Sequence, residues 1–188
     1  MATKKIGRIG FAQVEPNHLS GIVAGQIYAQ LPVDKTAMGE VIENGRFAKY
    51  DYAEGKVNLA GAGEWMLIYN EEKKYDERKQ GHKDFAMVSK NYTDGEIVPR
   101  LIKTNVGDIF TTNAFGANDA DDAEVEDAIT ITIDDVTGVC STVLGINKDT
   151  GYLDVKGAST DANGPEFEVA KVYTMADGQD GLKLVRIK

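Results

Sequence analysis

The residues best suited to chemistry form an acidic run at positions 118–127, with the sequence NDADDAEVED. Its carboxylates are oxygen ligands of the kind that a hard cation such as calcium prefers. The spacing lacks the central glycine and the closing glutamate of an EF-hand loop, and a solvated acidic loop is the simpler interpretation. We therefore expect no metal site in this run.

Cys140 is the one thiol of the chain, and His18 and His82 are the two bases that could activate it. It lies in an apolar, β-branched surrounding with Asp134 and Asp135 upstream, which disfavours a thiolate. We expect a small buried hydrophobe rather than a nucleophile. One cysteine and two histidines also supply neither an intramolecular disulfide nor a closed zinc site.

The sequence offers no further catalytic signature. Residues 59–64, LAGAGE, contain Gly-x-Gly but neither the third glycine nor the following helix of a dinucleotide site, and a strand-joining turn suffices. Nothing in the sequence brings two of the 30 Asp and Glu residues together as an acid and base pair. We therefore expect a protein that is not an enzyme and that takes no cofactor.

Two groups of residues could instead contact a protein partner. Tyr and Trp are favoured at protein interfaces, which makes Trp65, Tyr69 and Tyr75 candidates, although each could equally be a strand residue packed on a core. The first eleven residues lack a clear hairpin partner. This pattern predicts an extended arm that could add a strand to a sheet of a neighbouring protein. The apolar residues of this arm, and hence its candidate contacts, are Ile6, Ile9 and Phe11.

The net charge and the lack of long apolar stretches limit the partners that suit this chain. The chain has 188 residues, with 21 Lys and Arg against 30 Asp and Glu, a net charge of -9 that argues against binding free nucleic acid. No stretch approaches the roughly 18 apolar residues of a membrane span, and no signal peptide is visible, so we expect synthesis in a cytoplasm and no membrane partner.

The acidity is concentrated in the second half of the chain. Residues 1–103 carry 15 basic and 14 acidic side chains, whereas residues 104–188 carry 6 and 16. This shift predicts an N-terminal β domain over 1–103, with a charged loop at 71–90, and an acidic C-terminal domain resembling a small β-barrel over 104–188.

Strands dominate the local patterns. Asn44-Gly45 predicts a hairpin between residues 40–43 and 46–50, because both residues readily adopt positive φ. Apolar residues alternate in several segments, as expected of half-buried strands; these include Ile129, Ile131 and Ile133, then Phe167 and Val169, then Leu182 and Leu184, and the segment 64–69. The sequence therefore predicts a mainly β protein with two small antiparallel barrel-like or sandwich-like units and few helices.

Three passages resemble a family of small structural proteins of tailed bacteriophages. They are residues 4–32, residues 63–76 together with 97–113, and residues 167–187. The segments NGRF at 44–47 and VGDIF at 106–110 are similar to head decoration, or cement, proteins.

This resemblance implies a virion protein that binds the outside of the major capsid lattice and braces it against the pressure of packaged DNA. The partners would be the major capsid protein and, at lattice symmetry axes, further copies of the chain. Alternatives are a neck, tail or head-fibre component of the virion, or a module that binds host-surface carbohydrate through Trp65 and the tyrosines.

Overall fold

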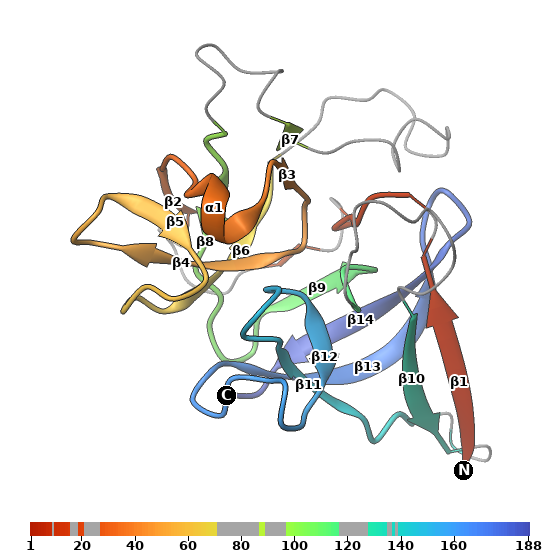
Figure 1. The fold of residues 1–188 in the computed structure, drawn as a ribbon. Coiled ribbons are helices and arrows are strands. Elements are labelled where there is room, and N and C mark those ends of the chain that lie inside the picture. Colours follow the sequence, from red (N-terminus) through yellow and green to blue (C-terminus); the bar gives the residue numbers. More distant parts are fainter. Residues whose placement is uncertain are drawn as a thin grey trace.

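A computed structural model describes residues 1–8, 10–15, 19–20, 27–70, 87–88, 97–116, 128–134, 137 and 139–188. In these residues the strands form two five-stranded sheets and two two-stranded sheets, all antiparallel (Figure 1). One short helix, α1 (Lys35–Met38), begins where the Asp34 side chain accepts a hydrogen bond from the backbone N–H of Thr36.

The first sheet comes from the N-terminal half of the chain. Its strands, in spatial order, are β2 (Ile27–Gln30), β8 (Arg100–Ile102), β6 (Trp65–Ile68), β4 (Phe47–Asp51) and β5 (Lys56–Asn58). Every residue of the central strand β6 is buried, and its side chains alternate between two hydrophobic clusters. Our prediction of a half-buried strand at 64–69 was therefore wrong, because this strand is covered on both faces.

Different elements of the chain cover the two faces of the first sheet. Met66 and Ile68 pack in one cluster with Met38 of α1 and with Ile42 of β3 (Val41–Ile42). The strand β3 pairs with β7 (Met87–Val88) to form a small separate sheet. Trp65 and Leu67 point to the opposite face, toward the second sheet. Figure 1 shows α1 and β3 above the first sheet and the second sheet below it.

The second sheet follows in the C-terminal half. Its order is β12 (Leu153–Val155), β11 (Val143–Ile146), β13 (Glu166–Thr174), β14 (Asp180–Arg186) and β9 (Ile109–Thr112). The alternating residues Leu182 and Leu184 are fully buried, as their spacing predicts. The register of β13 on β14 shifts between Val169 and Lys171, which interrupts the alternation after Val169.

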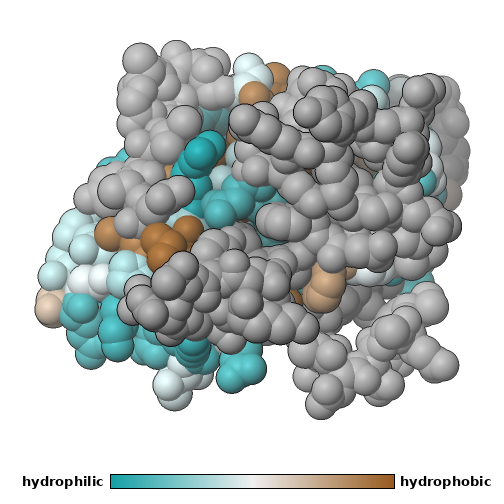
Figure 2. All heavy atoms as spheres, turned by 90° about the horizontal axis from the view of Figure 1, so that it is seen from above, coloured by the Kyte–Doolittle hydropathy of each residue, from teal (hydrophilic) through white to brown (hydrophobic). Residues whose placement is uncertain are grey.

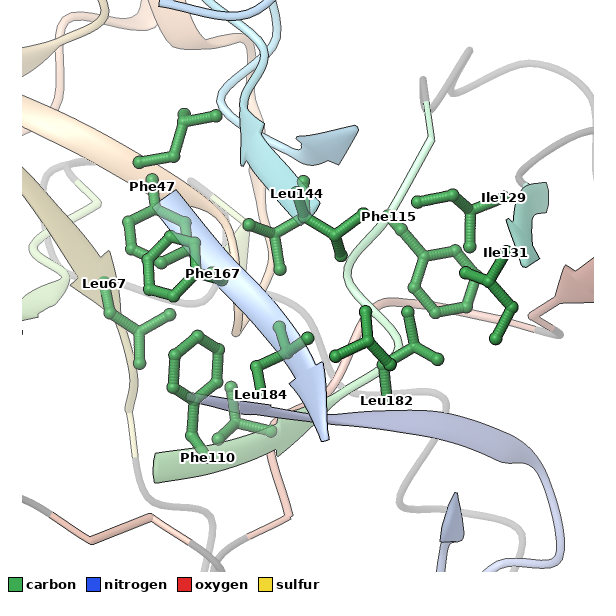
Figure 3. Packing of buried hydrophobic residues seen from close by; sticks show 14 of the residues in the cluster. Phe47, Leu67, Phe110, Phe115, Ile129, Ile131, Leu144, Phe167, Leu182 and Leu184 are labelled. Atoms are coloured by element: carbon green, nitrogen blue, oxygen red, sulfur yellow. The ribbon is translucent and has the colours of Figure 1, made fainter. Parts of the chain in front are cut away.

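Aromatic rings join the two sheets. Phe47 of β4 lies 5.4 Å from Phe167 of β13 and 6.2 Å from Phe110 of β9, measured between ring centroids. Phe110 and Phe167 meet edge to face at 5.4 Å. Figure 3 shows these rings together with Leu67 and Leu184, so that residues from both halves of the chain form one continuous core.

The N-terminal segment has a partner in its own chain. The strand β1 (Ala2–Gly7) pairs along its whole length with β10 (Ala128–Ile133), so the expectation of an arm without a partner was wrong. Ile6 lies opposite Ile129 in this ribbon, and both are buried in the shared core. Pattern reasoning missed the pair because more than 120 residues separate its strands.

The Asn44-Gly45 turn forms, but not as a hairpin. Gly45 adopts a φ of 89°, as the sequence suggests, yet β3 pairs with β7 rather than with β4. The Asn44 side chain accepts from the backbone N–H of Asn70 and donates to its carbonyl, and the N–H of Gly45 donates to Ile68. These bonds hold the turn at the end of β6.

The mainly β class is thus confirmed, with sheets that are packed as in a sandwich and are not closed into barrels. All strands of the first sheet precede residue 103, and all strands of the second follow it. The ribbon strand β1 nevertheless lies with β10 of the second half, and the core is shared. Two separately folding domains stay a prediction.

Candidate functional site

A pocket of about 310 Å³ opens at the seam between the two halves of the chain. Its walls come from β4, from the start of β6, from the loop between β12 and β13, and from the end of β14. The lining residues are Lys49, Gly63, Glu64, Trp65, Asp161, Asn163, Gly164, Pro165, Arg186 and Lys188.

Trp65 forms the centre of this seam. Its indole N–H donates a 2.8 Å hydrogen bond to Oδ2 of Asp161, and the Nζ of Lys49 lies 4.5 Å from the ring centroid. The register of the first sheet places Lys49 directly opposite Trp65, which brings the ammonium over the indole. Lys49 also donates to Asp161 across 3.3 Å, so the three side chains form one clasp between the two halves.

The clasp keeps Asp161 ionised. The hydrogen bond from Trp65 lowers the pKa of Asp161 below its ordinary value, and the backbone N–H of Asn163 and the ammonium of Lys49 act in the same direction against the effect of burial. Because the pKa is lowered on folding, the ionised carboxylate adds stability at neutral pH, and this contribution is lost as the pH falls through the folded-state pKa.

Replacing Asp161 by asparagine is expected to lower the free energy of unfolding at pH 7 by about 1 kcal/mol, since the clasp is partly exposed to solvent. The gap between the two proteins should narrow as the pH falls below about 4. Urea denaturation of both proteins between pH 3 and pH 7 measures this. A gap that is constant with pH would show that ionisation of Asp161 is not the cause.

Most of the other charged side chains of the pocket form ion pairs with neighbouring residues. Glu64 pairs with Lys103 at 2.8 Å, and Lys188 pairs with Glu166 at 3.0 Å. Hydrogen bonds from Lys156 and Lys188 lower the pKa of Glu166. Arg186 donates to the carbonyl and the hydroxyl of Thr104 and to the main-chain oxygen of Lys188, the last residue of the chain. Burial lowers the pKa of Arg186, against the attraction of Glu64 and Asp108.

A second cluster of charged residues is buried away from the pocket. The guanidinium of Arg8 lies 3.5 Å from Oε2 of Glu43, and the same oxygen accepts a 2.7 Å hydrogen bond from the Tyr152 hydroxyl. Arg8 and Arg46 lie 5.1 Å and 5.4 Å from the centroid of the Tyr152 ring. Arg46 donates to the carbonyls of Thr150 and Met38.

Burial controls the ionisation of this second cluster. It raises the pKa of the Tyr152 hydroxyl far above its usual range, with Glu43 acting in the same direction, so the hydroxyl stays a donor. Burial also lowers the pKa of Arg46, against the attraction of Tyr152 and Glu43. The cluster fastens residue 8 and the 43–46 turn to the hairpin between β11 and β12, which is a structural role.

Most of the predicted contact residues lie inside the molecule or outside the described part. Ile6 and Trp65 are 1% and 4% exposed and present almost no surface to a partner. Phe11 and Tyr69 are half-buried, and Tyr69 packs against the shared core. Ile9 and Tyr75 fall outside the described residues, as does the acidic run at 118–127.

The other candidates for chemistry have structural surroundings. Cys140 is buried within the shared core, as its apolar neighbours suggest. In the 59–64 loop, the backbone N–H groups of Ala60 and Gly61 donate to the side chain of Asn58, which makes a turn between β5 and β6. The described residues contain no group of three or more His, Cys, Asp or Glu arranged to hold a metal ion.

Pattern reasoning singled out Trp65 but missed Asp161, Lys49 and Arg186. The Trp65 and Asp161 side chains are 96 residues apart in sequence, so no local spacing connects them. One weak signal was present for Lys49, which lies between Ala48 and Tyr50 in a segment with the pattern of a strand.

Comparison with protein-family models, with curated protein sequences and with solved structures finds no match for this chain. Within the described residues, no helix has the length and apolar character that crossing a membrane requires.

Proposed function

We propose that this chain is a non-enzymatic virion structural protein of a tailed phage, which decorates the outside of the capsid lattice and stabilises it. The observation that carries the proposal is the β1–β10 ribbon, whose exposed strand is suited to binding a neighbouring sheet. The sequence resemblance to head decoration proteins supports the same role.

The ribbon is fastened at one end and exposed at the other. Ile6, Ile129 and Ile131 anchor it in the core, whereas the first four residues of β1 are exposed and Met1 is 84% exposed. Lys4 pairs with Asp180 at 2.9 Å, which links the ribbon to β14. An edge strand held in this way is ordered before binding, so pairing with a partner strand costs less conformational entropy than folding a free arm.

Charge supports a partner strand other than β1 of a second copy. Two copies of β1 paired antiparallel about Lys4 and Lys5 would set lysines opposite lysines, which is unfavourable. A strand of the major capsid protein that carries acidic residues avoids this repulsion. Each copy that bridges two capsid subunits raises the cost of separating them, even when each single interface is modest.

The described surface on one face of the molecule suits crowding on a particle. On the face shown in Figure 2 the described surface is mostly hydrophilic, and hydrophobic residues are confined to small areas. The net charge of -9 keeps neighbouring copies apart in solution and favours solubility.

Deleting residues 1–5 tests the ribbon, because the truncation retains the buried anchor Ile6. We expect the affinity for capsids to fall by about tenfold or more, with the unfolding temperature lowered by only a few degrees. Pelleting with capsids that lack the protein measures the occupancy. Unchanged occupancy of the truncated protein would contradict the role of the ribbon.

The geometry of Trp65 bears on the carbohydrate alternative. Sugar stacking needs an open aromatic face, but Trp65 is nearly buried and Lys49 lies over its ring. This favours a protein partner over a glycan. A neck, tail or head-fibre position is distinguished from decoration by the place of the protein in the virion, which immunogold labelling of intact particles reveals.

A further inference from the structure

The dipeptide Asn-Gly occurs twice in this chain, at residues 44–45 and at residues 163–164. It is the least stable context for an asparagine side chain, because glycine has no Cβ to shield its backbone nitrogen from the preceding carboxamide. That nitrogen closes a five-membered ring on the side-chain Cγ wherever the local backbone is free to move. The structure places the two dipeptides in opposite surroundings, so the fold should make their reactivities unequal.

The surroundings of Asn44 oppose the reaction. Its side chain is 8% exposed, accepts the N–H of Asn70 at 2.7 Å and donates to the Asn70 carbonyl at 3.0 Å. The attacking group, the backbone nitrogen of Gly45, donates to the carbonyl of Ile68 at 2.8 Å. Both reacting groups are therefore fixed to the end of the buried strand β6, and ring closure requires that this part of the core opens.

Asn163 lies in the turn at 161–164, within the loop between β12 and β13. Its side chain is exposed and forms no hydrogen bond with another described residue. The N–H of Asn163 donates to Oδ1 of Asp161, and the N–H of Gly164 donates to the carbonyl of Asp161, each at 3.0 Å. Only the second of these bonds holds the attacking nitrogen, so a local opening of this short turn is enough to release it.

We propose that Asn163 is a site of spontaneous deamidation whose product disturbs the clasp of Lys49, Trp65 and Asp161. Hydroxide removes the proton of the Gly164 backbone nitrogen, which then forms a bond to Cγ of Asn163. The bond between Cγ and the carboxamide nitrogen breaks, and this nitrogen takes a proton from water and leaves as ammonia. Water opens the resulting succinimide at either carbonyl, which gives aspartate or isoaspartate.

The turn that reacts lies against the clasp. Asn163 lines the seam pocket, and a Cβ on Gly164 would lie 3.3 Å from Cδ1 of Trp65. Either product replaces a neutral carboxamide of the pocket wall with a carboxylate, and isoaspartate also adds a methylene to the main chain between residues 163 and 164. Asp161 begins this turn and accepts the indole N–H of Trp65 at 2.8 Å, so a longer turn changes the surroundings of that proton. The inference is independent of the proposed capsid role.

The two dipeptides can be compared within one protein. We would incubate the full chain at mildly alkaline pH, with a parallel sample unfolded in urea, and follow both sites by peptide mapping with mass spectrometry. We expect the folded protein to deamidate Asn163 at least about tenfold faster than Asn44, and the unfolded chain to deamidate both at similar rates. Asn163→Gln is the matched control, because its longer side chain must form a six-membered ring, which closes far more slowly.

The single tryptophan reports the effect on the clasp. Because Trp65 is the only tryptophan, the ¹⁵N-labelled protein gives one indole N–H resonance. We expect a second indole resonance to grow at the rate at which Asn163 is converted, and to be absent from the Asn163→Gln protein.

Three results would overturn the proposal. The first is equal deamidation of Asn44 and Asn163 in the folded protein. The second is an intact Asn163 in the folded protein after both sites of the unfolded chain have reacted. The third is a single, unchanged indole resonance in the converted protein, because the product would then leave the clasp undisturbed.

Discussion

Replacing Glu43 by alanine is expected to lower the free energy of unfolding by about 3–5 kcal/mol. The Glu43 carboxylate is fully buried beside Arg8, and it accepts the hydrogen bond of the Tyr152 hydroxyl. Its removal leaves the buried guanidiniums of Arg8 and Arg46 with less compensating negative charge, and a buried charge that loses its partner is costly. Urea denaturation at pH 7 measures the loss.

Tyr152→Phe is the matched control for this prediction. It removes the same hydrogen bond but leaves the carboxylate facing Arg8, and we expect a loss of only about 1 kcal/mol. A Glu43→Ala protein as stable as Tyr152→Phe would show that the hydrogen bond, rather than the charge, accounts for the contribution of Glu43.

Replacing Gly151 by alanine is the second substitution with a large expected effect, about 3 kcal/mol or more. Gly151 adopts a φ of 77°, and its carbonyl accepts the N–H of Phe47 at 2.7 Å. A Cβ on Gly151 would lie 2.3 Å from the carbonyl oxygen of Phe47, so β4 and the turn at 147–151 would have to separate. This turn holds the β11–β12 hairpin against the first sheet.

Gly178→Ala isolates the backbone part of that cost. Gly178 has a similar φ of 86°, but a Cβ there meets nothing within 4 Å. We expect a loss of about 1 kcal/mol, the usual cost of an L-residue in this conformation. Thermal or urea unfolding of both variants gives the difference. Equal losses in the two variants would mean that the close approach of Phe47 to residue 151 has no energetic weight.

Local patterns predicted several of the strands but not their partners. The alternation of Ile129 and Ile131 predicted a strand with one buried face, and β10 has that face in the core. The Asn44-Gly45 pair predicted a turn, and the turn is present. Which strand pairs with which depends on contacts distant in sequence, such as β3 with β7, and alternation carries no information about them.

The candidate site was harder to predict for the same reason. The pocket and the buried cluster join residues about 100 positions apart, such as Glu43 and Tyr152, whose separation is 109. The sequence of β6 nevertheless indicates a strand that is buried on both faces, because four consecutive apolar residues replace the usual alternation. Read in that way, Trp65 would have been assigned to the core rather than to an exposed interface.

We propose that this protein binds and stabilises a capsid shell. The most direct test mixes the purified full chain with expanded capsids that lack it, pellets the particles, quantifies the bound copies and heats the particles to rupture. We expect saturation at a fixed ratio to the major capsid subunit and a higher rupture temperature. The absence of binding to the shell, or saturable binding that leaves the rupture temperature unchanged, would contradict the claim.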